Sequence, residues 1–242
     1  MATNNTILNN ARILAKGIVQ SNDTRLTSLN NNDLIIGPTG AGKTRSYVIP
    51  NLVHNSGESF VVVDTKGNLH KLYGAYLRGQ GYRTAVIDFV DCLHSPNGYD
   101  PVRLIGRDSA TGRFLEQDIL RVSAALCPED PCGDELYWTQ AAQMLIASLI
   151  ALTLERFDEC DHSMRTVCYL AENYRSDWVE ELFEDLAVSD SDSFAVREHR
   201  LATINKEADR MVASVLGIAV NALHPLSFDG AQNLFRKDQK LD

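Results

Sequence analysis

A glycine-rich run that ends in a lysine and a threonine is the part of this sequence best suited to chemistry. It consists of Gly37, Pro38, Thr39, Gly40, Ala41, Gly42, Lys43 and Thr44. The run satisfies every fixed position of the pattern G-x-x-x-x-G-K-[ST], whose backbone N–H groups surround the phosphates of a nucleotide. Lys43 is spaced to reach the β- and γ-phosphates, and the Thr44 hydroxyl to bind Mg²⁺. The pattern predicts a site for a nucleoside triphosphate with Mg²⁺.

The residues on either side of this run favour a strand before it and a helix after it. Residues 32–36 form a short apolar run with polar boundaries, which is typical of a buried strand. Residues 43–49 can form about two helical turns before Pro50 disturbs the pattern. A helix that begins here would bring the positive end of its dipole under the phosphates.

Three apolar runs in the first hundred residues predict an α/β fold. Residues 34–36, 60–64 and 84–89 read as strands, and residues 68–78 between them read as a helix. Strands that alternate with helices predict a parallel sheet, with ligands outside the carboxyl ends of its strands. Asp64 and Asp88 end two of these runs, so we expect both on the nucleotide side. Asp64 could touch the water shell of the metal, but capping of the next helix is the favoured interpretation.

The sequence changes character after about residue 110. Five segments favour helices, at residues 116–126, 137–157, 164–173, 178–186 and 194–223, and no comparable strand run occurs there. Because three strands make a poor sheet by themselves, we expect an all-helical domain inserted into a nucleotide-binding domain. The expected boundaries are 1–104 for the first part of the nucleotide-binding domain, 105–224 for the helical domain and 225–242 for the return segment.

The net charge of −9 is unevenly distributed over the 242 residues. Residues 1–110 contain 11 basic and 8 acidic side chains, whereas residues 111–242 contain 12 and 24. Residues 177–192 hold seven acids and no base, a stretch that would repel a nucleic-acid backbone. A solvated helical face is the favoured interpretation of that stretch, ahead of a dedicated partner site.

Other sequence features restrict the class of protein. The longest apolar run, at residues 144–154, falls short of the roughly 20 residues of a membrane span, and no signal-peptide pattern opens the chain. The five cysteines are odd in number and irregularly spaced, which favours reduced thiols over a metal site. No apolar strand run ends in Asp-Glu, the pair that orients Mg²⁺ and the attacking water in many ATPases. A small-molecule kinase remains an alternative, although a kinase lid should offer arginines and this helical block is acidic.

Six stretches of the sequence, in a fixed order, carry a resemblance to a known family. They are residues 37–51 (GPTGAGKTRSYVIPN), 60–67 (FVVVDTKG), 81–83 (GYR), 98–101 (GYDP), 137–141 (YWTQA) and 194–197 (FAVR). From about residue 33 to residue 235 the chain resembles the conjugative coupling proteins of type IV secretion systems, which are TraG/TraD-type DNA-transfer ATPases.

The resemblance implies a RecA-like P-loop motor domain, interrupted by an all-alpha domain, in a homo-hexamer at the cytoplasmic face of the plasma membrane. It implies that residues 37–44 bind ATP, with Lys43 on the phosphates and Thr44 on Mg²⁺. Asp64, a tentative catalytic residue, and Lys66 fall in an element that faces the nucleotide. The implied partners are single-stranded DNA, a relaxase and components of the secretion channel, with the all-alpha domain in contact with the DNA or its relaxase.

This chain departs from the family pattern in two ways. Members usually begin with membrane-spanning helices, and the chain ends where members re-enter the sheet toward an Asp-Glu strand. We therefore expect a monomeric fragment that contains the ATP-binding part, binds nucleotide poorly and hydrolyses little ATP. The alternative is a non-catalytic module whose acidic helices dock a relaxase or an accessory protein.

Overall fold

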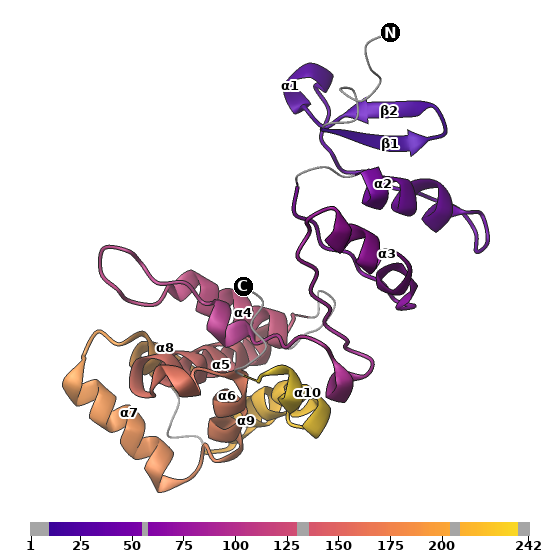
Figure 1. The fold of residues 1–242 in the computed structure, drawn as a ribbon. Helices are drawn as coiled ribbons and strands as arrows, with labels where there is room; N and C mark the ends of the chain where they lie inside the picture. The colour runs from indigo at the N-terminus through magenta and orange to yellow at the C-terminus, as the bar shows by residue number, and fades with distance from the viewer. Residues whose placement is uncertain (1–9, 55–57, 130–135, 204–208, 237–242) are drawn as a thin grey trace. The chain divides into compact units, whose positions relative to one another are not determined.

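The computed structural model describes residues 10–54, 58–129, 136–203 and 209–236 (Figure 1). The chain divides into two compact units, Met1–Thr84 and Ala85–Asp242. The first unit carries nine basic and four acidic side chains, a net charge of +5, and the second carries 14 and 28, a net charge of −14. The functional boundaries expected near residues 104 and 224 stay a prediction.

The first unit begins with an antiparallel hairpin, which Figure 1 shows as the two arrows near the N-terminus. Strand β1 (Ala11–Ala15) pairs with β2 (Ile18–Ser21), and the turn between them contains Gly17 at φ +76°. That φ lies in the left-handed region, where glycine has no Cβ to clash. A short helix, α1 (Thr24–Thr27), follows, and the Asp23 side chain caps it by accepting from the Arg25 N–H.

Two further helices of the first unit follow the glycine run at residues 37–44 and the stretch at residues 60–67. A π-helical turn, η1 (Thr44–Val48), begins at the end of the glycine run and continues into α2 (Ile49–His54). Helix α3 (Asn68–Gly79) follows Asp64 and confirms the helix predicted at residues 68–78. The buried residues of these helices are few, namely Leu52, Gly74 and Leu77.

The predicted parallel P-loop sheet is wrong for this structure. The two-stranded antiparallel pair β1–β2 is the one sheet among the described residues, and the runs at residues 34–36, 60–64 and 84–89 belong to no strand or helix. The apolar side chains of the first two runs are largely exposed, with Val61 96% and Val63 86% accessible, whereas Ile87 of the third is half-buried against the core of the second unit. Apolar, β-branched residues favour an extended backbone locally, whereas a strand also needs a neighbour that accepts and donates its ladder hydrogen bonds. The apolar pattern indicates a local preference for an extended backbone. It does not indicate whether a neighbouring strand is present.

The second unit is helical, and its longest helix lies at its centre. Helices α4 (Glu116–Leu126), α6 (Met164–Glu172), α8 (Phe194–Ala202) and α9 (Asp209–Leu223) all pack against α5 (Leu136–Arg156). Helix α7 (Asp177–Ser189) packs on α8, and α10 (Asp229–Leu234) lies against the short 3₁₀ turn η2 (Cys92–His94) (Figure 1). These elements confirm the helices predicted from periodicity, except that the long segment at 194–223 is two helices, α8 and α9; residues 204–208 between them lie outside the described residues.

Helix α5 is buried on almost every side, as a helix that is apolar all round must be. Its residues Leu145, Ile146, Leu149 and Ile150 are 1% exposed or less. By length and composition alone α5 could cross a membrane, which corrects the expectation that no run is long enough, but 61% of that stretch is buried under the other helices of its unit. Such burial is typical of the core helix of a globular unit.

A buried carboxylate joins the start of the second unit to its core. The Asp100 side chain accepts hydrogen bonds from the Ser163 hydroxyl at 2.6 Å and the Met164 N–H at 3.1 Å, where α6 begins, and from the Val102 N–H at 3.1 Å in η3 (Pro101–Leu104). Burial raises the pKa of Asp100, against the lowering effect of these hydrogen bonds and of Arg103. The segment before the helices is therefore held by the core.

Candidate functional site

The glycine loop, residues 37–44, is a compact turn in which two of the three glycines adopt a conformation that other residues avoid. Gly40 and Gly42 have φ values of +83° and +84°. The Ala41 N–H donates to the Pro38 carbonyl at 3.2 Å, which closes the turn. In the described part of the chain, the N–H groups of Gly40 and Gly42 donate to no protein acceptor. Both N–H groups are therefore available to an anion in the loop.

The Lys43 side chain folds back over this loop. Its ammonium donates to the Gly37 carbonyl and, at 3.0 Å, to the Pro38 carbonyl. The positive charge is thus held at the loop itself, on neutral acceptors. A charged phosphate oxygen makes a stronger hydrogen bond to an ammonium than a neutral carbonyl does.

The helix that follows the loop begins with a widened turn. The Ile49 N–H donates to the Thr44 carbonyl, a π-type i→i−5 bond. Pro50 has no N–H to donate to Ser46, so a widened turn fits the sequence at this point. The sequence analysis expected Pro50 to disturb the helix, and the disturbance is this π turn; helix α2 then continues through Pro50 to His54. Thr44 is exposed at the start of the turn.

An ion pair and a tyrosine hold the residues that precede the loop. Arg12 Nε lies 2.7 Å from Asp33 Oδ2, and both side chains are at least 85% buried, although the angle is not that of a linear hydrogen bond. The Tyr47 hydroxyl donates to the same oxygen at 2.7 Å. Burial and this hydrogen bond to Asp33 raise the pKa of Tyr47 to about 12. Asp33 therefore ties strand β1 and the turn η1 to the entry of the glycine loop.

Asn51 joins the hairpin to helix α2. Its side-chain oxygen accepts from the Ile13 N–H at 2.7 Å, and its side-chain nitrogen donates to the Ile13 carbonyl at 2.8 Å. The Asn51 amide thus satisfies the hydrogen-bonding capacity of both the N–H and the carbonyl of Ile13, as a neighbouring strand would. The same nitrogen donates to the Tyr47 carbonyl at 2.8 Å. The hairpin is consequently fixed to the helix that begins at Thr44.

Asp64 caps helix α3, as the favoured interpretation predicted. Its Oδ2 accepts from the N–H groups of Leu69 at 2.7 Å and His70 at 3.3 Å, two of the groups that a helix start leaves unpaired. Gly67, at φ +63°, donates its N–H to the Asp64 carbonyl at 3.1 Å and turns the chain into the helix. In the part of the chain that the structure describes, no hydrogen bond or ion pair joins Asp64 to the glycine loop.

Asp88 lies in the second unit. Its Oδ1 accepts from the N–H groups of Val90 and Asp91, each at 2.9 Å, and so shapes a local turn. Its expected place on the nucleotide side stays a prediction. A search of the described residues finds no group of three or more His, Cys, Asp or Glu side chains arranged to hold a metal ion.

One protein-family model matches almost the whole chain. The model describes the conjugative DNA transfer proteins of the type IV secretory system, and the match covers residues 4–238. The chain belongs to this conjugative DNA-transfer family. A search of curated proteins found no match. Membership confirms the resemblance drawn from the six sequence stretches and places the protein with the DNA-transfer machinery of type IV secretion.

The geometry of this family member adds residues that the sequence analysis missed. No local pattern points to Arg12, Asp33 or Tyr47, and Asn51 is only the last residue of the stretch 37–51. Their contacts join residues up to 38 positions apart, and no local spacing signals such pairs. Lys66, which the family resemblance places in an element that faces the nucleotide, is an exposed residue of the turn before α3. Its role at the nucleotide stays a prediction.

Proposed function

We propose that the glycine loop of this protein binds ATP with Mg²⁺, and that the chain supplies the ATP-binding part of a conjugative DNA-transfer ATPase. The observation that carries the proposal is the loop itself. A complete phosphate-binding pattern coincides with two left-handed glycines whose N–H groups have no protein acceptor, and with an ammonium held at the loop. The positive charge of the first unit, +5, further favours a polyphosphate.

The residues present fit both groups. The N–H groups of Gly40 and Gly42 and the ammonium of Lys43 would bind phosphate oxygens, and the exposed Thr44 hydroxyl would bind Mg²⁺. The ion supplies neutralisation of the phosphate charge. A catalytic role of Asp64 stays a prediction, since its Oδ2 holds the start of α3 and no described contact joins it to the glycine loop.

The wider role follows from family membership. We propose that the protein links a relaxase bound to single-stranded DNA with the secretion channel, as part of a homo-hexamer at the inner face of the cytoplasmic membrane. Because no apolar run of the sequence ends in Asp-Glu, this chain should hydrolyse little ATP. Robust turnover that disappears in Lys43→Ala would contradict this expectation of low hydrolysis while supporting the site.

Calorimetric titration with MgATP tests the binding proposal. Lys43→Ala should weaken binding about 10- to 100-fold, the value of one or two charge-assisted hydrogen bonds. Lys71→Ala, which removes the same charge from an exposed position of α3, is the matched control and should bind as the wild type does. Equal affinity of the wild type and Lys43→Ala would contradict the proposal.

A second candidate function, a docking module for a relaxase or an accessory protein, is favoured by the net charge of −14 on the second unit. The exposed acids of α7 are the natural contact for a basic partner. Replacement of Glu180, Glu181 and Glu184 by Gln should then weaken capture of the cognate relaxase and reduce the salt dependence of that capture. Unchanged capture would contradict this role for α7.

A further inference from the structure

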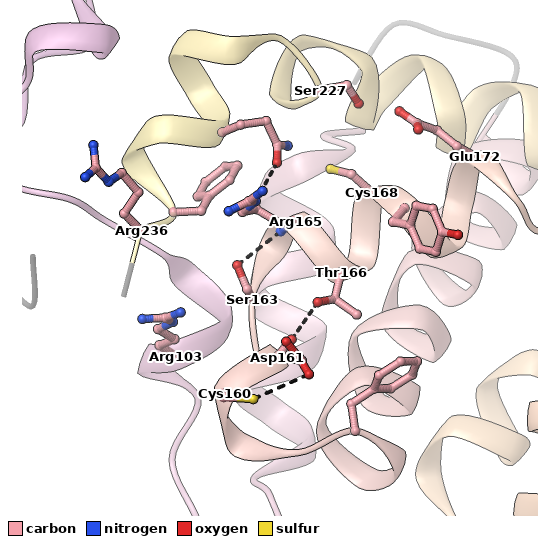
Figure 2. Close-up of a pocket in the computed structure, with 14 residues that line it drawn as sticks. Arg103, Cys160, Asp161, Ser163, Arg165, Thr166, Cys168, Glu172, Ser227 and Arg236 are labelled. Atoms are coloured by element: carbon pink, nitrogen blue, oxygen red, sulfur yellow. Dashed lines mark hydrogen bonds between the residues drawn. The ribbon is translucent and has the colours of Figure 1, made fainter. Parts of the chain in front are cut away.

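The second unit contains an open pocket of about 800 Å³ that the proposed function does not use. It lies among the start of α6, the turn η4 (Glu159–Asp161) and the segment after α10 (Figure 2). Its volume is within the usual range of ligand sites, roughly 300–1,000 Å³. The pocket is far larger than a single water or simple anion needs.

Three arginines from three separate elements line this pocket. Arg103 comes from η3, Arg165 from the first turn of α6, and Arg236 from the segment directly after α10. In the view of Figure 2 Arg103 and Arg236 lie at the left, Glu172 lies at the right, and Arg165 lies between them. The guanidinium group is a planar fork of donors that matches the two oxygens of a carboxylate.

Arg165 is an exposed arginine whose side-chain hydrogen-bond partner in the described part of the chain is neutral. Its Nε donates to the neutral Gln232 side chain at 3.2 Å, and no carboxylate of the described residues forms an ion pair with it. Asp161 and Glu172 line the same pocket but do not approach it within ion-pair distance. Arg103, in contrast, lies 3.7 Å from the buried Asp100 and donates to the His162 carbonyl at 3.2 Å. The contacts of Arg103 with Asp100 and His162 explain its position by a structural role. Among the described residues Arg165 has no carboxylate partner of this kind, so its charge can meet a bound anion.

The rest of the lining indicates what kind of anion fits. Three aromatic residues, Phe157, Tyr169 and Phe235, supply apolar surface, and Asp161 and Glu172 supply negative charge at the same pocket. A polyanion such as DNA would be repelled by these acids and by the net charge of −14 on the unit. A short peptide segment with one or two carboxylates carries far less negative charge than DNA and meets a correspondingly smaller repulsion, and its apolar side chain can pack on the aromatics.

We propose that this pocket is a docking site for a short acidic peptide segment of a protein partner, anchored by a carboxylate on Arg165 and Arg236. The site lies wholly in the second unit and does not depend on nucleotide binding. An experiment can therefore find that the pocket binds no peptide while the glycine loop binds ATP, or the reverse, and the two results are distinguishable.

Selection from a displayed library of random heptapeptides on the full chain tests this proposal. Enriched peptides should contain Asp or Glu together with an aromatic or aliphatic residue, and an enriched peptide synthesised with a fluorescent label should bind saturably. The double variant R165A/R236A should weaken that peptide at least tenfold. Replacement of the acids of the peptide by their amides should have the same effect. R121A removes the same charge from an exposed position of α4 outside this pocket and should bind as the wild type does.

A charge-conserving variant separates the site from an effect on folding. R165K/R236K keeps the charges but loses the forked geometry, so its affinity should fall between those of the wild type and the alanine variant, with MgATP binding unchanged in both. Three results would overturn the proposal: enrichment of no peptides or of peptides without acids, equal binding by R165A/R236A, or tighter binding of an oligothymidine than of any selected peptide with the same dependence on Arg165.

Discussion

The two units of this protein differ in how they are stabilised. The second unit buries a 21-residue helix, α5, beneath at least four others, whereas the first unit buries few side chains and leaves Val61 and Val63 exposed. The first unit depends instead on specific polar contacts, among them the ion pair of Arg12 with Asp33 and the two bonds of Asn51 to Ile13. The proposed ATP site therefore lies in the unit held by polar contacts, and the stable scaffold lies in the other.

Two aspartates show the same contrast at the scale of single residues. Asp64 and Asp100 each accept backbone N–H groups near the start of a helix, α3 and α6 respectively. Asp64 is partly exposed, whereas Asp100 is 7% exposed and also accepts from the Ser163 hydroxyl. Equivalent capping contacts should thus contribute differently in the two units, since water can replace the lost contact at Asp64 but not at Asp100.

The largest effect is expected in the core of the second unit. Leu149→Ala removes a fully buried side chain from α5 and should cost about 3 kcal/mol in the free energy of unfolding. Leu72→Ala, at a 69% exposed position of α3 in the first unit, should change it by less than about 0.5 kcal/mol. Both tryptophans, Trp138 and Trp178, lie in the second unit, so urea unfolding followed by tryptophan fluorescence measures the cost of Leu149→Ala, and hydrogen exchange of the α3 amides measures that of Leu72→Ala. Similar costs for the two variants would remove the contrast between the units.

Loss of the buried carboxylate should have an effect nearly as large. Asp100→Ala leaves the Ser163 hydroxyl and the N–H groups of Val102 and Met164 without their acceptor, at a cost of about 2–3 kcal/mol. The same fluorescence measurement checks this value. A cost below about 0.5 kcal/mol would mean that water reaches these groups.

The pH dependence of stability should follow from the raised pKa of Asp100. Since burial raises this pKa above its ordinary value of 3.8, protonation favours the folded state. The stability of the wild type relative to Asp100→Asn should be greatest below pH 3.8 and should decrease as the pH rises through the pKa of the folded state, above which it is constant. Urea unfolding of both proteins across this interval measures the difference, and an increase with pH would contradict the assigned direction.

The smallest effect is expected at the exposed cap of the first unit. Asp64→Ala removes the acceptor for Leu69 and His70 and should cost about 1 kcal/mol locally. Hydrogen exchange of the α3 amides should become about fivefold faster, while amides of α9 in the second unit keep their rates. Unchanged exchange in α3 would show that the cap contributes nothing to the helix.

The helices could be predicted from the sequence because their signals are local. The period of apolar residues located α4, α5 and α6 to within a residue or two at either end, and the Asp64 cap followed from its place before α3. The parallel sheet could not be predicted in the same way, since a strand exists only where a distant segment pairs with it. The apolar runs at residues 34–36 and 60–64 specify an extended backbone and nothing about a partner.

The candidate site likewise has a part that could be predicted from local sequence and a part that could not. The glycine loop follows from eight consecutive residues, and the left-handed Gly40 and Gly42 agree with what the pattern requires. The residues that hold the loop in place, Asp33 and Asn51 among them, meet partners from β1 that lie 21 and 38 positions away. Such contacts become visible only once the chain is folded.

Hydrogen–deuterium exchange with and without MgATP tests the central claim most directly. If the glycine loop of the first unit binds ATP, amides of residues 37–48 should gain protection, the helices of the second unit should keep their exchange rates, and Lys43→Ala should abolish the change. Absence of protection at residues 37–48 with saturating MgATP, or protection of the same size in Lys43→Ala, would contradict it.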